Sequence, residues 1–207
     1  MAMRVLVTGF EAYWDYTINS SWEVACKIEK HCMPNVEIIV RQMPVRFASV
    51  AKALRRDFEM YQPDLILMLG QSGGSNCVKL ERTALNLMDA HLPDNDGFIP
   101  VDQAIDNNDE SAYFTNCPIK LLLTALQEKK IESKISNSCG LYVCNRLYYE
   151  ALKISKTYPN VSALFVHLPF YEGQPTAKIG KPTMKIEKMI TATETIINII
   201  HGQNRTI

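Results

Sequence analysis

The sequence contains no uninterrupted apolar run approaching the roughly 20 residues that a membrane-spanning helix requires. Its start leads directly into a short apolar segment at residues 5–7, too brief for the hydrophobic region of a signal peptide and without a cleavage pattern after it. An excess of charge is also absent, because 22 Lys and Arg residues balance 22 Asp and Glu residues. The protein therefore has no overall electrostatic field that would attract nucleic acid or an anionic membrane. We expect a cytoplasmic protein with a small or locally recognised partner, which is neither nucleic acid nor membrane.

The motifs of metal sites and disulfide frameworks are missing as well. None of the 6 cysteines stands in a CxxC pair, and the 4 histidines are scattered singly, so the ligand spacing of a zinc site is not found. Disulfide frameworks belong to small secreted chains with thin cores. We therefore expect free thiols and no metal.

What the sequence does contain is an alternation of strand-like and helix-like apolar patterns. Strands are predicted at residues 5–8, 36–41, 65–69, 134–136 and 162–167, with a further extended stretch at 78–88. Helices are predicted at residues 20–32, 47–61, 118–130 and 144–158, and an apolar stripe over 186–200 indicates a C-terminal helix. This order predicts one domain over residues 1–207, a three-layer α/β/α sandwich with a twisted, largely parallel (mixed) sheet.

Two connecting regions carry signals of their own. Ser20 and Glu23 have the spacing of a capping box, so Ser20 is expected to cap the first helix. Residues 92–108 are dense in Pro, Asp, Asn and Gly, which are turn formers. They are expected to form an ordered surface excursion, or a lid.

Three side chains are candidates for chemistry. Cys144 follows the turn at Gly140 and begins a predicted helix, where the helix dipole favours a thiolate. By residue type alone, a cysteine is more often a small buried hydrophobe. His167 ends the predicted strand 162–167, where an imidazole can take the proton of a thiol and return it to a leaving amine. Glu81 could orient that imidazole, or form a surface ion pair with Arg82.

The glycine-rich segment 70–74 leaves the function open at this point. It lacks the lysine of a P-loop and the spacing of a dinucleotide fingerprint, and its amides are better suited to a substrate carbonyl or oxyanion. A phosphorylase or other transferase that binds phosphate there is one alternative. A non-catalytic protein whose aromatic first loop holds a small ligand is another.

Seven pieces of the chain, nearly end to end and in the same order, resemble the pyroglutamyl peptidases, also called pyrrolidone-carboxylate peptidases. They are residues 5–11 with Asn19 and Ser21; 43–45; 70–71 through 81–82 with Asn86; 89–90 with 93–95; 112–114; 136–145; and 165–169. The resemblance implies a cysteine peptidase that removes N-terminal pyroglutamate from peptides through a thioester, without a cofactor. It also implies a homo-oligomer, commonly a tetramer.

By the same resemblance, Glu81, Cys144 and His167 match the family's catalytic residues, and Cys144 is selected over Cys139. The substrate-binding residues that it implies are Phe10, Tyr13, Gln71, Leu92, Tyr142 and Val143, with Gln71 acting through its backbone.

Three departures from the family pattern concern the site. Residues 11–15 read Glu-Ala-Tyr-Trp-Asp where the family typically has a proline, a phenylalanine and glycines, which predicts a bulkier and stiffer mouth. His91 stands where many relatives carry arginine, so any electrostatic help from it would depend on pH. Arg146 is close enough in sequence to lower the pKa of Cys144, or it points to solvent.

Overall fold

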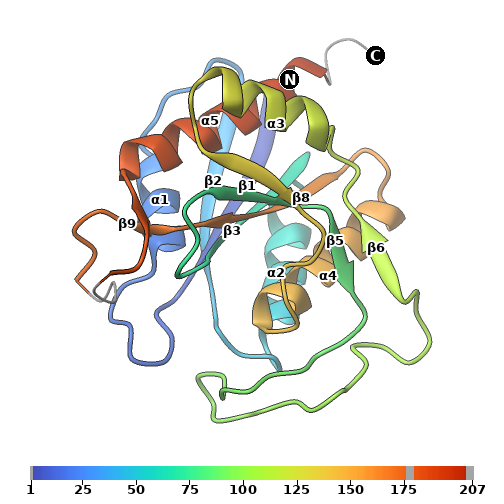
Figure 1. Cartoon of the computed structure of the whole chain (residues 1–207). Coiled ribbons are helices and arrows are strands. Elements are labelled where there is room, and N and C mark those ends of the chain that lie inside the picture. Colours follow the sequence, from blue (N-terminus) through green and yellow to red (C-terminus); the bar gives the residue numbers. More distant parts are fainter. Residues whose placement is uncertain (1, 176–179, 204–207) are drawn as a thin grey trace.

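The computed structural model describes residues 2–175 and 180–203, and its central feature is a six-stranded sheet (Figure 1). The strand order is β2-β1-β3-β8-β4-β7. Their bounds are Met3–Phe10 for β1, Val36–Met43 for β2, Leu65–Gln71 for β3, Val78–Glu81 for β4, Ser133–Ser136 for β7 and Ser162–Leu168 for β8. Strands β2, β1, β3 and β8 are parallel, whereas β4 is antiparallel to β8 and parallel to β7. The predicted mixed, mainly parallel sheet is confirmed.

Helices cover both faces of this sheet, as expected for a sandwich (Figure 1). The helices are α1 (Ser20–Ile28), α2 (Val50–Tyr61), α3 (Ile119–Glu128), α4 (Val143–Thr157) and α5 (Ile186–Gln203). Successive side chains of a strand point to opposite faces. Val5 and Leu67 accordingly pack with α1, α3 and α5 in one apolar core, while Leu6 and Ile66 pack with α2 and α4 in the other. No helix within the described part of the chain is long and apolar enough to cross a membrane.

Residues 92–108 form an ordered excursion without helix or strand, as predicted. The excursion lies between β5 (Thr83–Leu85) and β6 (Ala112–Phe114), which pair antiparallel. Buried Asp94 holds the excursion to the body of the protein, because its carboxylate accepts hydrogen bonds from the amides of Phe47 at 2.9 Å and Phe98 at 3.0 Å. A further small pair, β9 (Phe170–Tyr171) with β10 (Thr183–Met184), was not expected from the sequence.

The predicted cap of the first helix and the predicted start of the second are wrong. Asn19 caps α1 in place of Ser20, because its side chain accepts from the amide of Ser21 at 3.1 Å, and the helix ends at Ile28. Helix α2 begins at Val50 and not at Phe47, because residues 47–49 form a turn. The predicted extended stretch 78–88 is divided after Glu81 into β4 and β5.

Candidate active site

The antiparallel pairing of β4 with β8 brings Glu81 to His167. Lys79 lies opposite His167 in the register and Glu81 lies opposite Phe165, so the carboxylate and the imidazole are diagonal neighbours on one face of the sheet. Glu81 Oε1 lies 2.8 Å from His167 Nδ1, with side chains that are only 1% and 8% exposed. When Nδ1 carries the proton it donates to Glu81, which fixes the tautomer and leaves Nε2 with a free lone pair.

A close approach between β3 and β8 makes room for this histidine. Gly70 pairs with His167 in the register. A Cβ atom at Gly70 would lie 2.7 Å from ring atoms of Phe165 and 3.0 Å from His167 Cδ2. Glycine is therefore needed here for packing against the histidine, and not for a special backbone conformation.

Cys144 is the second residue of α4, and its side chain is partly exposed in the wall of a cavity. Burial raises the pKa of its thiol to about 12, and the negative charge of Glu81 adds to this effect. Both effects oppose the thiolate that the helix start was expected to favour. Arg146 does not offset the burial either, since its guanidinium lies 3.4 Å from Glu150.

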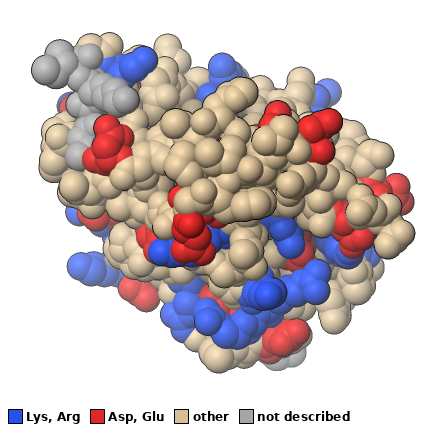
Figure 2. Space-filling model, turned by 90° about the horizontal axis from the view of Figure 1, so that it is seen from below, with Lys and Arg blue, Asp and Glu red and all other residues tan. Residues whose placement is uncertain are grey.

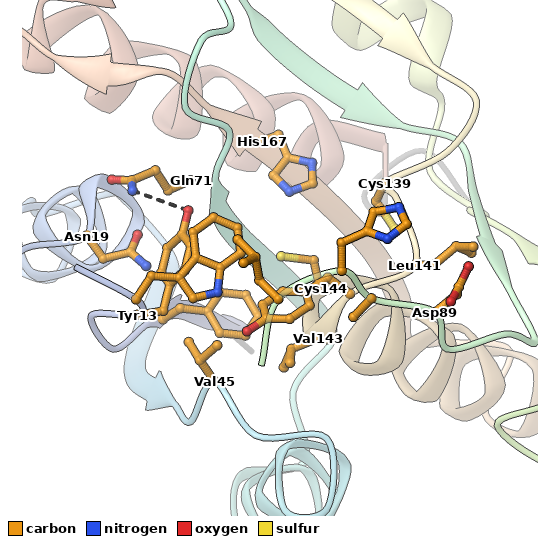
Figure 3. Close-up of a pocket in the computed structure, with 16 residues that line it drawn as sticks. Tyr13, Asn19, Val45, Gln71, Asp89, Cys139, Leu141, Val143, Cys144 and His167 are labelled. Carbon is orange, nitrogen blue, oxygen red and sulfur yellow. Dashed lines mark hydrogen bonds between the residues drawn. The ribbon is translucent and has the colours of Figure 1, made fainter. Parts of the chain in front are cut away.

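The cavity has a volume of about 410 Å³ and unites the predicted site residues. Its lining includes Cys144, His167 and all six predicted substrate-binding residues: Phe10, Tyr13, Gln71, Leu92, Tyr142 and Val143. Glu81 is not part of the lining and lies behind His167. Figure 3 shows the His167 ring and the Cys144 sulfur facing the same part of the cavity.

One end of the cavity carries a buried network of polar groups. Gln71 Oε1 accepts from the amide of Ser20 at 2.9 Å and from Gln174 Nε2 at 2.8 Å. Gln71 Nε2 donates to the Tyr13 hydroxyl at 3.4 Å, the bond drawn in Figure 3. Burial raises the pKa of Tyr13 well above its ordinary value, so this phenol stays neutral.

An aromatic cluster ties the excursion to the mouth of the cavity. The carbonyl of Pro93 accepts from Trp14 Nε1 at 3.1 Å and from the Tyr142 hydroxyl at 2.8 Å. The Trp14 ring centre lies 4.8 Å from that of Tyr13 and 5.7 Å from that of Tyr142. These contacts join the first loop, the excursion and the start of α4, three segments that are far apart in the sequence.

Comparison with known proteins agrees with this geometry. The sequence model of the family described as pyroglutamyl peptidase matches residues 3–203. The chain belongs to the pyroglutamyl peptidase family. As a member of it, the chain is a cysteine-type hydrolase that removes N-terminal pyroglutamate from peptides, and neither the transferase nor the non-catalytic alternative applies.

Individual relatives cover almost the whole chain. The pyrrolidone-carboxylate peptidase of Thermococcus onnurineus is 39% identical over 196 residues, which is 94% of this chain and 97% of the relative. That of Yersinia pestis (strain Pestoides F) is 38% identical, over 95% of this chain and 92% of the relative. Among solved structures, pyroglutamyl peptidase I of Bacillus amyloliquefaciens superposes with a TM-score of 0.88 at 30% identity, covering 94% of each chain. A mutant pyrrolidone carboxyl peptidase of Pyrococcus furiosus gives a TM-score of 0.90 at 34% identity, covering 95% of this chain and 97% of the other.

The cavity also contains residues that sequence reasoning did not assign to the site. They are Asn19, Val45, Asp89, Ala90 and Leu141, and they join Trp14, His91 and Cys139, which the sequence had already drawn to attention. Most of these five newly assigned residues lie inside the segments that resemble the family. Membership in those segments was the sequence signal that could have identified them.

Of the glycine-rich segment 70–74, only Gln71 lines the cavity of this pyroglutamyl peptidase. The amide of Ser72 donates to the Leu168 carbonyl at 2.7 Å, and a Cβ at Gly73 would lie 2.4 Å from the Phe170 ring. The segment packs against the end of β8 and against β9. These contacts give no support to the alternative that residues 70–74 bind a phosphate group.

Proposed function

We propose that Cys144 is the nucleophile of this pyroglutamyl peptidase, that His167 is its acid and base, and that Glu81 positions the imidazole. The single observation that supports this assignment best is the buried 2.8 Å pair of Glu81 with His167 Nδ1, beside a thiol in the same cavity. Since Glu81 holds Nδ1 and does not line the cavity, Nε2 is the nitrogen left for the thiol.

The raised thiol pKa of Cys144 defines the first step. With a pKa of about 12 the free thiol holds its proton at neutral pH, so His167 Nε2 must take it as Sγ attacks the carbonyl that joins pyroglutamate to the next residue. The imidazolium that forms is stabilised by the Glu81 carboxylate. The first donor inside α4 is the amide of Asn145, so the earlier amides of Val143 and Cys144 have no intrahelical acceptor and are suited to the developing oxyanion.

Product release and deacylation then use the same imidazole. The His167 imidazolium gives its proton to the departing amine, the C–N bond breaks, and the pyroglutamyl group stays on Cys144 Sγ as a thioester. Water, deprotonated by Nε2, attacks the thioester and frees pyroglutamate, and the thiol regains its proton. The amine thus leaves with the proton of the thiol, and the hydrolytic water supplies the proton that restores the thiol.

The proposed pyroglutamyl pocket suits a flat ring that is uncharged and polar only at its lactam. Phe10, Tyr13, Tyr142 and Val143 offer largely apolar walls. The side chain of Gln71 is occupied by three partners, Ser20, Gln174 and Tyr13, which favours its backbone as the group that meets the lactam. Leu92 is proposed to contribute from the excursion.

The catalytic assignment is tested by release of a fluorophore from a pyroglutamyl amide. We expect Cys144→Ala to lose at least about 10³-fold in kcat/KM, because no other group replaces the nucleophile. Cys139→Ala, a change in the same cavity, should keep at least about a tenth of the wild-type value, since Cys139 Sγ is engaged with Asn145 Oδ1 at 3.6 Å. Wild-type activity in Cys144→Ala would end the proposal. Loss of activity in a folded Cys139→Ala protein would transfer the role to Cys139.

We also propose that this single domain of residues 1–207 works in the cytoplasm as a homo-oligomer, in the form of a tetramer. The oligomer is supported by apolar side chains that the excursion leaves in solvent, namely Phe98, Ile99 and Val101 with 44%, 45% and 70% exposure. Light scattering of the purified protein measures the subunit number directly.

A further inference from the structure

The residues that line the active-site cavity divide by exposure. Trp14, His91 and Leu92 are exposed, whereas all the others are buried or intermediate. Trp14 and Leu92 leave 47% and 48% of their surface in solvent. We call these three residues the rim of the cavity.

A pyroglutamyl peptide must cross this rim. If the proposed function holds, the pyroglutamyl ring is the end of the peptide and occupies the buried part of the cavity, next to Phe10 and Gln71. The peptide continues beyond the scissile bond and has to return to solvent. The side chain that follows pyroglutamate therefore meets the exposed members of the lining, and these are the rim residues.

Trp14 is held rigidly for such a contact. Its backbone φ is 53°, in the left-handed region that a bulky residue rarely adopts, and such strain persists only where the surroundings enforce it. The hydrogen bond of Nε1 to the Pro93 carbonyl and the ring of Tyr142 at 5.7 Å fix the indole from two sides. An aromatic surface that is already immobilised loses little entropy when another side chain packs on it.

The small number of charged residues around the cavity also favours an uncharged side chain after pyroglutamate. Asp89 is the only Asp, Glu, Lys or Arg residue that lines the cavity in the described part of the chain. Figure 2 views the molecule from the side of the excursion, and there Lys and Arg gather in the lower part while charged side chains are sparser above them. An anionic second residue of the peptide thus finds no permanent cationic partner among the lining residues, and Asp89 is the only fixed charge that a cationic one would meet there.

We propose that Trp14, together with Leu92, binds the side chain of the residue that follows pyroglutamate and makes the enzyme select aromatic and large aliphatic residues at that position. An aromatic side chain gains both the burial of its own surface and an offset or edge-on contact with the indole. An alanine side chain at the same place gains almost nothing from either.

The test compares kcat/KM for pyroglutamyl-Phe-Ala and pyroglutamyl-Ala-Ala, with the released dipeptide quantified by chromatography. We expect the wild type to favour the Phe peptide by about tenfold, which matches ~1.4 kcal/mol. Trp14→Gly should bring this ratio to within about twofold of one, and glycine also suits the positive φ, so this variant is expected to fold. Trp14→Phe should give an intermediate ratio. Phe114→Ala removes an exposed aromatic residue outside the cavity and should keep the wild-type ratio.

A wild type that cleaves both peptides equally through Cys144, or a Trp14→Gly variant that keeps the full preference, overturns the role of Trp14. Cleavage of the peptides by Cys144→Ala would instead overturn the catalytic assignment. The two failures are therefore distinguishable in one set of measurements.

Discussion

Glu81→Gln removes the charge behind His167 while the side chain keeps its size. In the wild type the carboxylate can only accept, so it selects the imidazole tautomer with the proton on Nδ1, 2.8 Å away. A carboxamide also donates. When its NH₂ group faces Nδ1, that nitrogen must accept and Nε2 carries the proton, which is the wrong tautomer for a base that takes a proton from Cys144.

The size of the effect follows from the role that is lost. A positioned general acid and base contributes about 10²- to 10⁴-fold to rate, or ~2.7 to 5.4 kcal/mol of barrier. Because the Glu81 side chain is 1% exposed, water does not replace the lost acceptor. We expect kcat/KM to fall by about 10³-fold. The charge of Glu81 also raises the pKa of Cys144, so its removal should lower that pKa and increase the thiolate fraction at alkaline pH.

Two assays separate these opposite effects. Hydrolysis of a fluorogenic pyroglutamyl amide reports catalysis, and the pH dependence of Cys144 alkylation by iodoacetamide, followed on the peptide that contains it, reports the thiol. The variant should hydrolyse more slowly and be alkylated faster at a given alkaline pH. Glu110→Gln, at a side chain that is 62% exposed, is the matched control and should change neither. A Glu81→Gln enzyme with wild-type kcat/KM would refute the positioning role, and slower alkylation in a folded variant would refute the electrostatic reasoning.

Two further substitutions test the packing and the surface electrostatics. Gly70→Ala places a Cβ 2.7 Å from the Phe165 ring, so we expect unfolding in urea to become easier by about 1–3 kcal/mol, with a loss of activity; unchanged stability would contradict the close approach. In Asp109, burial opposes ionisation. The ion pair with Lys153 and the hydrogen bonds from the Tyr113 hydroxyl and the Glu110 amide nevertheless hold its pKa below the ordinary value of 3.8, so its ionised form stabilises the fold above that pH. Asp109→Asn should cost about 1–2 kcal/mol at pH 7 in urea titrations, and the difference from wild type should narrow as the pH falls below 3.8; a constant difference would argue against it.

Apolar periodicity predicted most of the regular elements, because the buried strands β1, β3 and β8 and the long helix α5 show their patterns over many residues. It failed at a helix boundary and at the direction of a short strand. Residues 47–49 form a turn before α2, and apolar spacing does not distinguish such a turn from the first turn of a helix. The direction of β4 is likewise not encoded in its four residues, since it depends on pairing with β8.

The residues of the candidate site were predictable to different degrees. Cys144 and His167 stand at a helix start and a strand end, positions that their own segments indicate. Glu81 came from family resemblance, because only the register of β4 against β8 brings it to the histidine. The rise in the pKa of Cys144 was not predictable, since it depends on how completely the folded chain removes the sulfur from water.

The reversed direction of β4 has a consequence for how this site can be reached. Glu81 approaches His167 from the interior of the sheet, while Cys144 and the rest of the imidazole belong to the cavity wall. Small molecules that enter through the rim therefore meet Cys144 and His167, the proposed nucleophile and base, whereas Glu81 lies outside the cavity lining. An inhibitor that binds in the cavity can therefore contact Cys144 and His167. The contribution of Glu81 is changed by substitution of this buried residue.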